Sequence, residues 1–298
     1  MTMKKRAFSF VILAGLFWGI TGIMSTYLGE YGFTGLQSTA VRAATSFLLM
    51  LLYVLLFDRP ALRTTFKEIA FFVGIGAALF GTSTAYFYAI PRTSNATAVV
   101  LMYTSPVMVA VVSSLFLGER FSKLKVVSVG MMLIGCLFVS GVIGDLRADF
   151  VGVLLGLLAA VSYATYNILT KIAMRRGSPA ITVTVYSFGF MTLFSLLLCR
   201  PADILTAASE HPYPVIPLAV GIGLLTCVIP YVLYTAAMKT LSAGTACALS
   251  IVEPMSATVY CMLLFGQYPD LLSTIGIVLI LLAVFLLGKA QNGEIPEK

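Results

Sequence analysis

Charged residues are scarce in this sequence of 298 residues, and their scarcity decides the class of protein. Only 10% of the residues are Asp, Glu, Lys or Arg, whereas 59% are hydrophobic. The mean hydropathy is +1.00. Soluble domains carry about 25% charged residues, so this composition excludes a soluble globular protein. The sequence indicates an integral membrane protein.

Residues that build metal centres and nucleotide sites are also few. The one histidine, His211, lies in a loop beside Pro212 and has no neighbouring ligand set. The five cysteines lack the spacings of a metal site or a disulfide framework, so we expect them to fill space as small apolar side chains. The sequence has no GxxxxGK[ST] loop, which argues against direct coupling to ATP within this chain. We therefore expect no cofactor and no metal.

Long polar segments are missing too, because the longest connection between apolar runs covers only residues 200–213. Function must then reside within the membrane. Ten apolar runs have about the 20 residues that a helix needs to cross roughly 30 Å of hydrocarbon. Lipid offers no partners to backbone polar groups, and the runs lack the alternation of barrel strands, so they must be helices. The predicted spans are residues 8–27, 34–57, 69–90, 95–117, 124–143, 150–174, 180–199, 214–238, 243–265 and 271–288.

The distribution of basic residues predicts the orientation of the chain. If the N-terminus is inside, most of the 19 Lys and Arg residues face the cytoplasm, whereas the outer segments hold only Arg92, Arg147 and Arg200. Loops rich in Lys and Arg stay in the cytoplasm, so we expect both termini there, in a multi-pass protein of the cell (inner) membrane. This placement explains the net charge of +7 without nucleic acid as a partner. The first run follows MTMKKR and lacks a cleavage pattern, which predicts a retained first helix.

An internal repeat divides the chain into two units. A shift of 148 residues aligns 86–118 with 234–266, and ten of these 33 pairs are identical, including Pro106 with Pro254. A shift of 145 aligns LAGLFW with LAAVSY and sets Trp18 opposite Tyr163.

We expect one five-helix unit in residues 1–147 and a second in residues 148–298. Since five is odd, the second unit crosses the membrane in the opposite sense. The fold class is therefore all-α, with ten transmembrane helices in two inverted repeats. Inverted repeats are typical of secondary transporters, whose substrate sites lie between the repeats near the midplane.

Several short motifs fall in register with this duplication. They are FWG at 17–19, Arg42 in the second span, SP at 105–106 with LGE at 117–119, and EP at 253–254 with FGQ at 265–267. On these motifs the chain resembles the EamA-type members of the drug/metabolite transporter superfamily over nearly its whole length. The resemblance implies a central cavity formed by both halves and transport of amino acids, other small metabolites or drugs, commonly outward. Gln267 departs from the glutamate usual at the second helix end.

Glu253 is the acidic residue placed deepest in the predicted membrane, about 15 Å from the start of its span. Its helical neighbours form a small and polar face, which suits a cavity wall or a tight helix contact. Transport is the role we expect, and structural pairing or capping of freed backbone groups is the alternative. Pro254 frees the carbonyl oxygen of Ser250, and Pro106 does the same at Met102. Such paired breaks in corresponding spans indicate a binding region.

Arg42 is the second charge within a predicted span, about 12 Å below its outer end. Polar residues lie at helical neighbour spacings, so its guanidinium could face a wet interior shared with Glu253 or pair with that carboxylate directly. Snorkelling to the outer interface is an equal alternative for so long a side chain. Lys171, near the inner end of its span, is expected to be a snorkelling anchor.

Aromatic residues beside small polar ones provide a third group of candidates. This mixture suits the enclosure of a modest amphiphilic solute, although helix packing and an interfacial aromatic belt are alternatives. Asn167 could bond a ligand or bridge helices. The predicted substrate-binding residues are Trp18, Arg42, Tyr86, Tyr103, Tyr163, Asn167, Tyr234 and Glu253, with helix breaks at Pro106 and Pro254.

These observations predict a secondary transporter that works by alternating access on a small metabolite, with an amino acid or related amphiphile preferred and export favoured by the resemblance. Its partners are the solute, the lipid bilayer and, in a further hypothesis, protons that bind Glu253 during the cycle. Two alternatives stay open: an uncoupled facilitator of a drug or metabolite, and a membrane-embedded enzyme. The enzyme is disfavoured because the sequence contains no HExxH, no G-x-S-x-G and one deep carboxylate.

Overall fold

The computed structural model describes residues 3–93, 95–119, 122–140 and 149–292, and these ranges are helical with short connections and no strand. The first half comprises α1 (Met3–Trp18), α2 (Thr21–Glu30), α3 (Gly35–Phe57), α4 (Phe66–Ala89), α5 (Asn95–Met102), α6 (Ser105–Phe116) and α7 (Lys123–Val139), with 3-10 turns at Arg59–Leu62 and Ile90–Arg92. The second half comprises α8 (Phe150–Arg175), α9 (Ala180–Leu198), α10 (Pro201–Glu210), α11 (Pro212–Gly223), a π-helix (Leu224–Val228), α12 (Ile229–Ala237), α13 (Ala243–Leu249), α14 (Val252–Phe265) and α15 (Leu271–Asn292).

Ten predicted spans correspond to these elements, although several are broken. Within the described residues, nine continuous or interrupted helices are long and apolar enough to cross a membrane. The tenth is α7, whose 17 residues extend over about 26 Å. The end predicted for this span at residue 143 lies outside the described residues. The longest predicted connection contains α10, a short helix packed beside α11.

Helix contacts follow the repeat. α4 packs along α8, and their counterparts α12 and α1 pack on each other in the same way. α5 and α6 contact α8, just as α13 and α14 contact α1. The pairs α3 with α9 and α7 with α15 each join a helix to its own counterpart. This mutual pattern is that of two inverted five-helix repeats.

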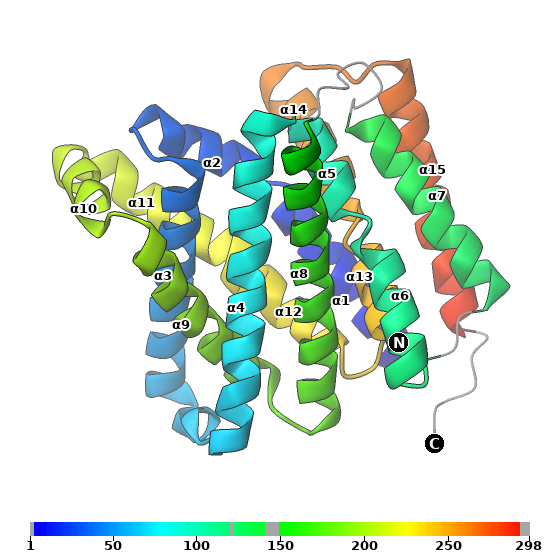
Figure 1. Cartoon of the computed structure of the whole chain (residues 1–298), viewed down its shortest axis with the longest axis horizontal. Coiled ribbons are helices and arrows are strands. Elements are labelled where there is room, and N and C mark those ends of the chain that lie inside the picture. Colours follow the sequence, from blue (N-terminus) through cyan, green and yellow to red (C-terminus); the bar gives the residue numbers. More distant parts are fainter. Residues whose placement is uncertain (1–2, 94, 120–121, 141–148, 293–298) are drawn as a thin grey trace.

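Helices of each sequence half therefore pack among helices of the other half. We name α4, α5, α6 and α8 the α8 group, and α1, α12, α13 and α14 the α1 group. Each group combines helices from both halves of the sequence, and Figure 1 shows α8 lying beside α4 and α5, with α1 near α12 and α13. The connections α3–α4, α8–α9 and α12–α13 lie at the end that is lower in Figure 1. They carry Arg59, Arg63, Arg176 and Lys239, so we name this end the basic end and the opposite end the open end.

Local sequence explains where the helices begin and end. Thr34 and Thr65 each cap a helix in a capping box with Gln37 and Glu68. Gly118 and Gly266, a pair related by the repeat, have φ angles of +66° and +63° and end corresponding spans. A side chain would be strained in this left-handed conformation, which explains why glycine occupies both positions.

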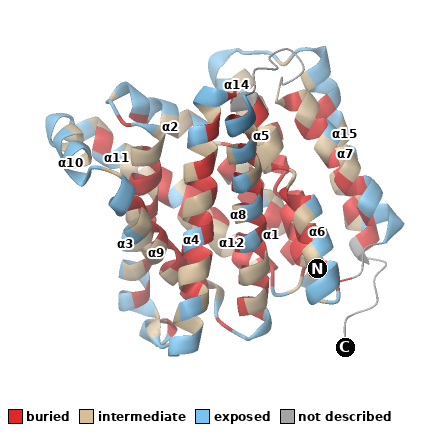
Figure 2. Cartoon of the chain, viewed as in Figure 1, coloured by how far each residue is buried: buried red, intermediate tan, exposed pale blue. Residues whose placement is uncertain are grey.

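Burial has the pattern expected in a bilayer. Figure 2 shows buried residues along the interior of the bundle and exposed residues around its outside. Much of the exposed surface is apolar, as at Leu48, Phe57, Leu115, Leu197 and Leu282. Lipid is as apolar as these side chains, so a helix surface of this kind is stable in a membrane.

Lys171 corrects one expectation from the sequence. Its side chain does not snorkel, because the residue is only 5% exposed and lies inside the bundle. The Nζ atom donates to the carbonyl oxygens of Met238 and Leu241. An ammonium buried among helices is stabilised by such acceptors, and the neighbouring α12–α13 connection supplies them.

Candidate substrate cavity

A cavity of about 630 Å³ lies between the α1 group and the α8 group, with further walls from α2 and α3. Its lining includes Gly35 at the start of α3, Ile90 at the end of α4 and Ser140 at the end of α7. These residues all lie at the open end of the bundle. Toward the basic end, the lining stops at a layer of aromatic rings.

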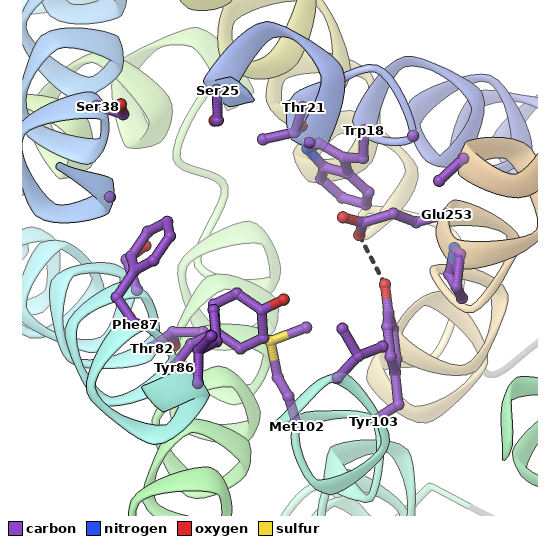
Figure 3. Close-up of a pocket in the computed structure, with 18 of the residues that line it drawn as sticks. Trp18, Thr21, Ser25, Ser38, Thr82, Tyr86, Phe87, Met102, Tyr103 and Glu253 are labelled. Atoms are coloured by element: carbon purple, nitrogen blue, oxygen red, sulfur yellow. Dashed lines mark hydrogen bonds between the residues drawn. The ribbon is translucent and has the colours of Figure 1, made fainter. Parts of the chain in front are cut away.

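Glu253 lies on one wall of the cavity, where two helix breaks meet. It is the second residue of α14, and Tyr103 lies in the interruption between α5 and α6. The Tyr103 hydroxyl donates to Oε2 of Glu253 at 2.6 Å, as Figure 3 shows. The broken fourth and ninth spans thus come together through one strong hydrogen bond.

Both predicted discontinuities are present. Pro106 lies in the first turn of α6 and Pro254 in the first turn of α14, so each span restarts at its proline. The carbonyl oxygen of Ser250 accepts from the backbone N–H of Glu253 at 2.9 Å and lies 3.4 Å from the Tyr103 hydroxyl. Pro254 lines the cavity, whereas Pro106 is buried outside it.

Arg42 lies on the α3 wall of the same cavity. The Nε atom of its guanidinium is buried and has no hydrogen-bond partner among the described residues. Its backbone is held firmly, because the Thr45 and Ser46 hydroxyls donate to its carbonyl oxygen. Ser46 also bonds the carbonyl oxygen of Gly223 at 3.1 Å, which fixes α3 beside the π-helix.

Arg42 and Glu253 face one space without pairing. The ion pairs within 4.0 Å in the described part of the chain do not include them. The sequence left a shared interior, direct pairing and snorkelling as alternatives for Arg42, and the structure shows the shared interior. The cavity offers a guanidinium on one wall and a carboxyl group on another.

A cluster of six rings, which we name the aromatic floor, lies at the bottom of the cavity, and three of them, Trp18, Tyr163 and Tyr231, line it. Trp18 lies 5.1 Å from Tyr231 and 5.2 Å from Tyr234, measured between ring centroids. Tyr166 contacts Tyr163, Tyr231 and Tyr234 at 5.8–6.2 Å. The aromatic floor consists of Trp18, Tyr163, Tyr166, Phe188, Tyr231 and Tyr234.

The aromatic floor also carries one donor that lacks a partner. The indole Nε1 of Trp18 is buried and makes no hydrogen bond within the described structure. Figure 3 shows the Trp18 ring above the carboxyl group of Glu253, at the edge of the cavity. An indole N–H is a donor only, so an acceptor group of a bound solute could satisfy it.

The structure places six of the eight predicted substrate-binding residues around the cavity and two below it. The six are Trp18, Arg42, Tyr86, Tyr103, Tyr163 and Glu253. Asn167 and Tyr234 are both 0% exposed and do not line it. The Tyr234 hydroxyl donates to Oδ1 of Asn167, whose Nδ2 donates to the carbonyl oxygen of Tyr163 at 2.7 Å. Asn167 therefore bridges α8 and α12, which is the alternative that the sequence left open for it.

Several lining residues escaped the prediction. They are small polar or apolar residues that resemble ordinary packing residues, and Figure 3 shows them around the cavity: Thr21, Ser25, Thr82, Phe87 and Met102. A helical pattern could have found some of them, because Leu79, Thr82, Ser83, Tyr86 and Ile90 lie on one face of α4. Phe87 and Met102 carry no comparable pattern.

Comparisons with known proteins agree with this architecture. The EamA-like transporter family matches residues 5–141 and again residues 150–289. An uncharacterized transporter of Archaeoglobus fulgidus is 26% identical over 271 residues, covering 90% of this chain and 92% of the relative. The uncharacterized transporter YwfM of Bacillus subtilis is 25% identical and covers 98% of this chain and 97% of its own.

A solved crystal structure shares the fold. It superimposes with a TM-score of 0.80 at 21% identity and covers 96% of this chain and 97% of the other. At this identity the likeness concerns the fold alone. The double match of the family to the two repeats, around a cavity open to one end, makes this chain a membrane transporter that belongs to the EamA-like transporter family.

Proposed function

We propose that this transporter moves a zwitterionic amphiphile, of which an amino acid is the simplest example, out of the cytoplasm by alternating access. The observation that supports the proposal best is the separation of charge in the cavity. Arg42, whose Nε atom has no hydrogen-bond partner among the described residues, lies on one wall, and Glu253 lies on another above an aromatic floor. This arrangement complements a molecule that has a carboxylate, an ammonium group and an apolar part.

Each part of such a solute has a matching group. A guanidinium binds a carboxylate through two parallel hydrogen bonds, which suits Arg42. The Glu253 carboxylate attracts an ammonium group, and the rings of Trp18 and Tyr231 offer apolar surface and cation–π contact. A cavity of about 630 Å³ lies within the usual range of small-molecule sites, roughly 300–1,000 Å³.

The charges of the chain support an orientation of the cavity, whereas export is preferred because the resemblance to the EamA-type family favours it. Positively charged connections favour the cytoplasm, so the basic end faces inside and the cavity opens outward. Export then requires a second state in which the basic end opens. Because each group combines both halves of the sequence, the α1 group and the α8 group are the units that move, and the sequence halves are not.

Counterflow in proteoliposomes tests the proposal. Vesicles loaded with one unlabelled amino acid should accumulate the same radiolabelled amino acid, and Arg42→Met should lose most of this exchange. A panel should include amines that lack the carboxylate and acids that lack the ammonium group. If these are exchanged as well as the complete amino acid is, the zwitterion proposal is wrong. Recovery of the solute chemically unchanged separates transport from the alternative of a membrane enzyme.

Coupling to protons is a separate hypothesis that rests on Glu253. Protonation neutralises a buried carboxylate and lowers the cost of moving it through apolar surroundings. Under this hypothesis Glu253→Gln, which keeps the shape of the side chain, abolishes the dependence of transport on a proton gradient. If the variant keeps both the full rate and that dependence, the hypothesis is abandoned. An uncoupled facilitator would show no dependence in either protein.

A further inference from the structure

The basic end of the bundle is closed by contacts between the two groups. α13 packs against α6 and α8, and α12 packs against α8. The counterparts of α13 and α6 in the repeat are α5 and α14. At the open end these two helices form different walls of the cavity, which Met102 of α5 and Ala257 of α14 line. The α1 group and the α8 group therefore meet at one end and are separated at the other.

Lys171 crosses the closed contact. From α8, its Nζ atom donates to the carbonyl oxygen of Met238 at 2.9 Å and to that of Leu241 at 2.6 Å. Both acceptors belong to the connection between α12 and α13, in the α1 group, and both residues are 0% exposed. Hydrogen bonds from an ammonium are about twice as strong as neutral ones. Opening the basic end breaks both of them.

Glu119 crosses the same contact a few residues after α6. Its Oε1 atom accepts from the backbone N–H of Ala243 at 2.9 Å, and its side chain is 1% exposed. Arg175 supports it, since Nη1 donates to the carbonyl oxygen of Leu117 at 2.7 Å and Nη2 lies 4.0 Å from the carboxylate. Lys171 and Glu119 thus both reach from the α8 group to residues 238–243 of the α1 group.

The repeat identifies the corresponding positions at the open end. The shift of 148 residues relates Glu119 to Gln267, and the shift of 145 relates Lys171 to Thr26. Both counterparts are exposed and uncharged. Closure of the open end by the symmetric motion would bring these residues toward the segment around Ile90 and Thr93, without a charge on either side chain. The closed basic end therefore has contacts from two charged side chains, and a closed open end would lack charges at the corresponding positions.

We propose that Lys171 and Glu119 form a charged latch that keeps the basic end closed and makes the state with an open outer cavity the resting state. The latch raises the free energy of the state that is open at the basic end, relative to the resting state. It therefore controls how often the transporter opens to the basic side. The proposal rests on alternating access and is independent of the identity of the solute.

Cys247 provides a reporter of the closed contact. It lies on α13, it is 0% exposed, and its Sγ atom is 3.8 Å from the Ser105 hydroxyl of α6. Opening of the basic end would separate α13 from α6 and admit a thiol reagent. A protein that keeps Cys247 as its only cysteine can therefore be alkylated with N-ethylmaleimide, in membranes and without any solute. The rate of alkylation measures the open population.

Lys171→Met and Glu119→Ala should each raise the alkylation rate of Cys247 by about tenfold or more. Lys67→Met removes an exposed lysine at the same end and should leave the rate unchanged. A second single-cysteine protein that keeps Cys136, buried in α7, distinguishes opening from unfolding. Cys136 should stay protected in both latch variants.

Two results would overturn the latch. One is an unchanged rate at Cys247 in both variants, which would show that the contacts do not hold the basic end closed. The other is an equal rise at Cys247 and Cys136, which would show that the two residues stabilise the fold as a whole. Neither result depends on the solute, so failure of the latch and failure of the zwitterion proposal are separable.

Discussion

Replacement of Arg42 by methionine removes the only guanidinium among the described residues that line the cavity, and leaves most of the side-chain volume in place. The described residues make no hydrogen bond to its Nε atom and no ion pair with its side chain, so the substitution removes neither kind of contact from the fold. Thermal stability should therefore hardly change. Any effect on binding then reports a contact with the solute.

The expected magnitude follows from the type of bond lost. Hydrogen bonds to charged groups contribute about 1.5–3 kcal/mol, and about 1.4 kcal/mol corresponds to a tenfold change in Kd. Arg42→Met should raise the Kd of an amino acid by roughly 10- to 150-fold. Arg42→Lys keeps the charge but loses the planar fork, so its Kd should fall between those of the wild type and Arg42→Met.

Equilibrium binding of a radiolabelled amino acid to the purified protein measures these constants. Arg59→Met is the matched control, because Arg59 bonds the carbonyl oxygen of Leu55 at the basic end and does not line the cavity. An amine that lacks the carboxylate should bind wild type and Arg42→Met alike. If Arg42→Met binds the complete amino acid with the wild-type Kd, Arg42 does not hold the carboxylate and the assignment of the site fails.

Three further predictions concern packing and buried polar groups. Gly135→Ala should lower thermal stability by about 1–3 kcal/mol, because its Cβ would lie 2.8 Å from a carbonyl oxygen of α15, whereas Gly130→Ala in the same helix meets nothing within 4 Å and should be neutral or stabilising. Asn167→Leu should cost about 1–3 kcal/mol in thermal unfolding, since it leaves the buried Tyr234 hydroxyl without its acceptor, and Tyr234→Phe added to it should recover part of the loss. Trp18→Phe should keep the fold and weaken solute binding by about three- to tenfold, because it removes an indole donor that has no internal partner; unchanged binding would exclude a contact between that donor and the solute.

The sequence predicted the features that the membrane imposes on any chain. Lipid allows few backbone structures, so the apolar runs predicted the spans closely, and the duplication predicted two inverted repeats. The exchange of helices between the halves was not predicted, because it depends on contacts between distant helices. The positions of Pro106 and Pro254 predicted the breaks for a local reason, the missing N–H of proline. The depth of Glu253 predicted a cavity wall or a tight helix contact, because a carboxylate facing lipid is costly, and the structure has it in the cavity lining.

Features that depend on contacts between distant segments could not be predicted. The first span breaks after Trp18, where a Cβ atom on Gly19 would lie 2.2 Å from the Ser256 hydroxyl of α14. This close approach requires glycine, and the FWG motif at 17–19 singles out Gly19 without indicating that its neighbour lies on α14. Lys171 was wrongly predicted to snorkel for the same reason, since its acceptors lie about seventy residues away at Met238 and Leu241.

The positions of Asn167 and Tyr234 connect the cavity with the latch. Tyr163, Asn167 and Lys171 are spaced by four residues on α8, so they form one stripe that descends about 6 Å per step toward the basic end. Tyr163 lines the cavity, Asn167 bonds Tyr234 below it, and Lys171 holds the closed contact. A helical pattern identifies the face of α8 that lines the path, but the conformation of the bundle determines how far along that face the cavity extends. If the latch opens, we expect Asn167 and Tyr234 to be the next groups below the cavity, and their role in binding the solute stays a prediction for that state.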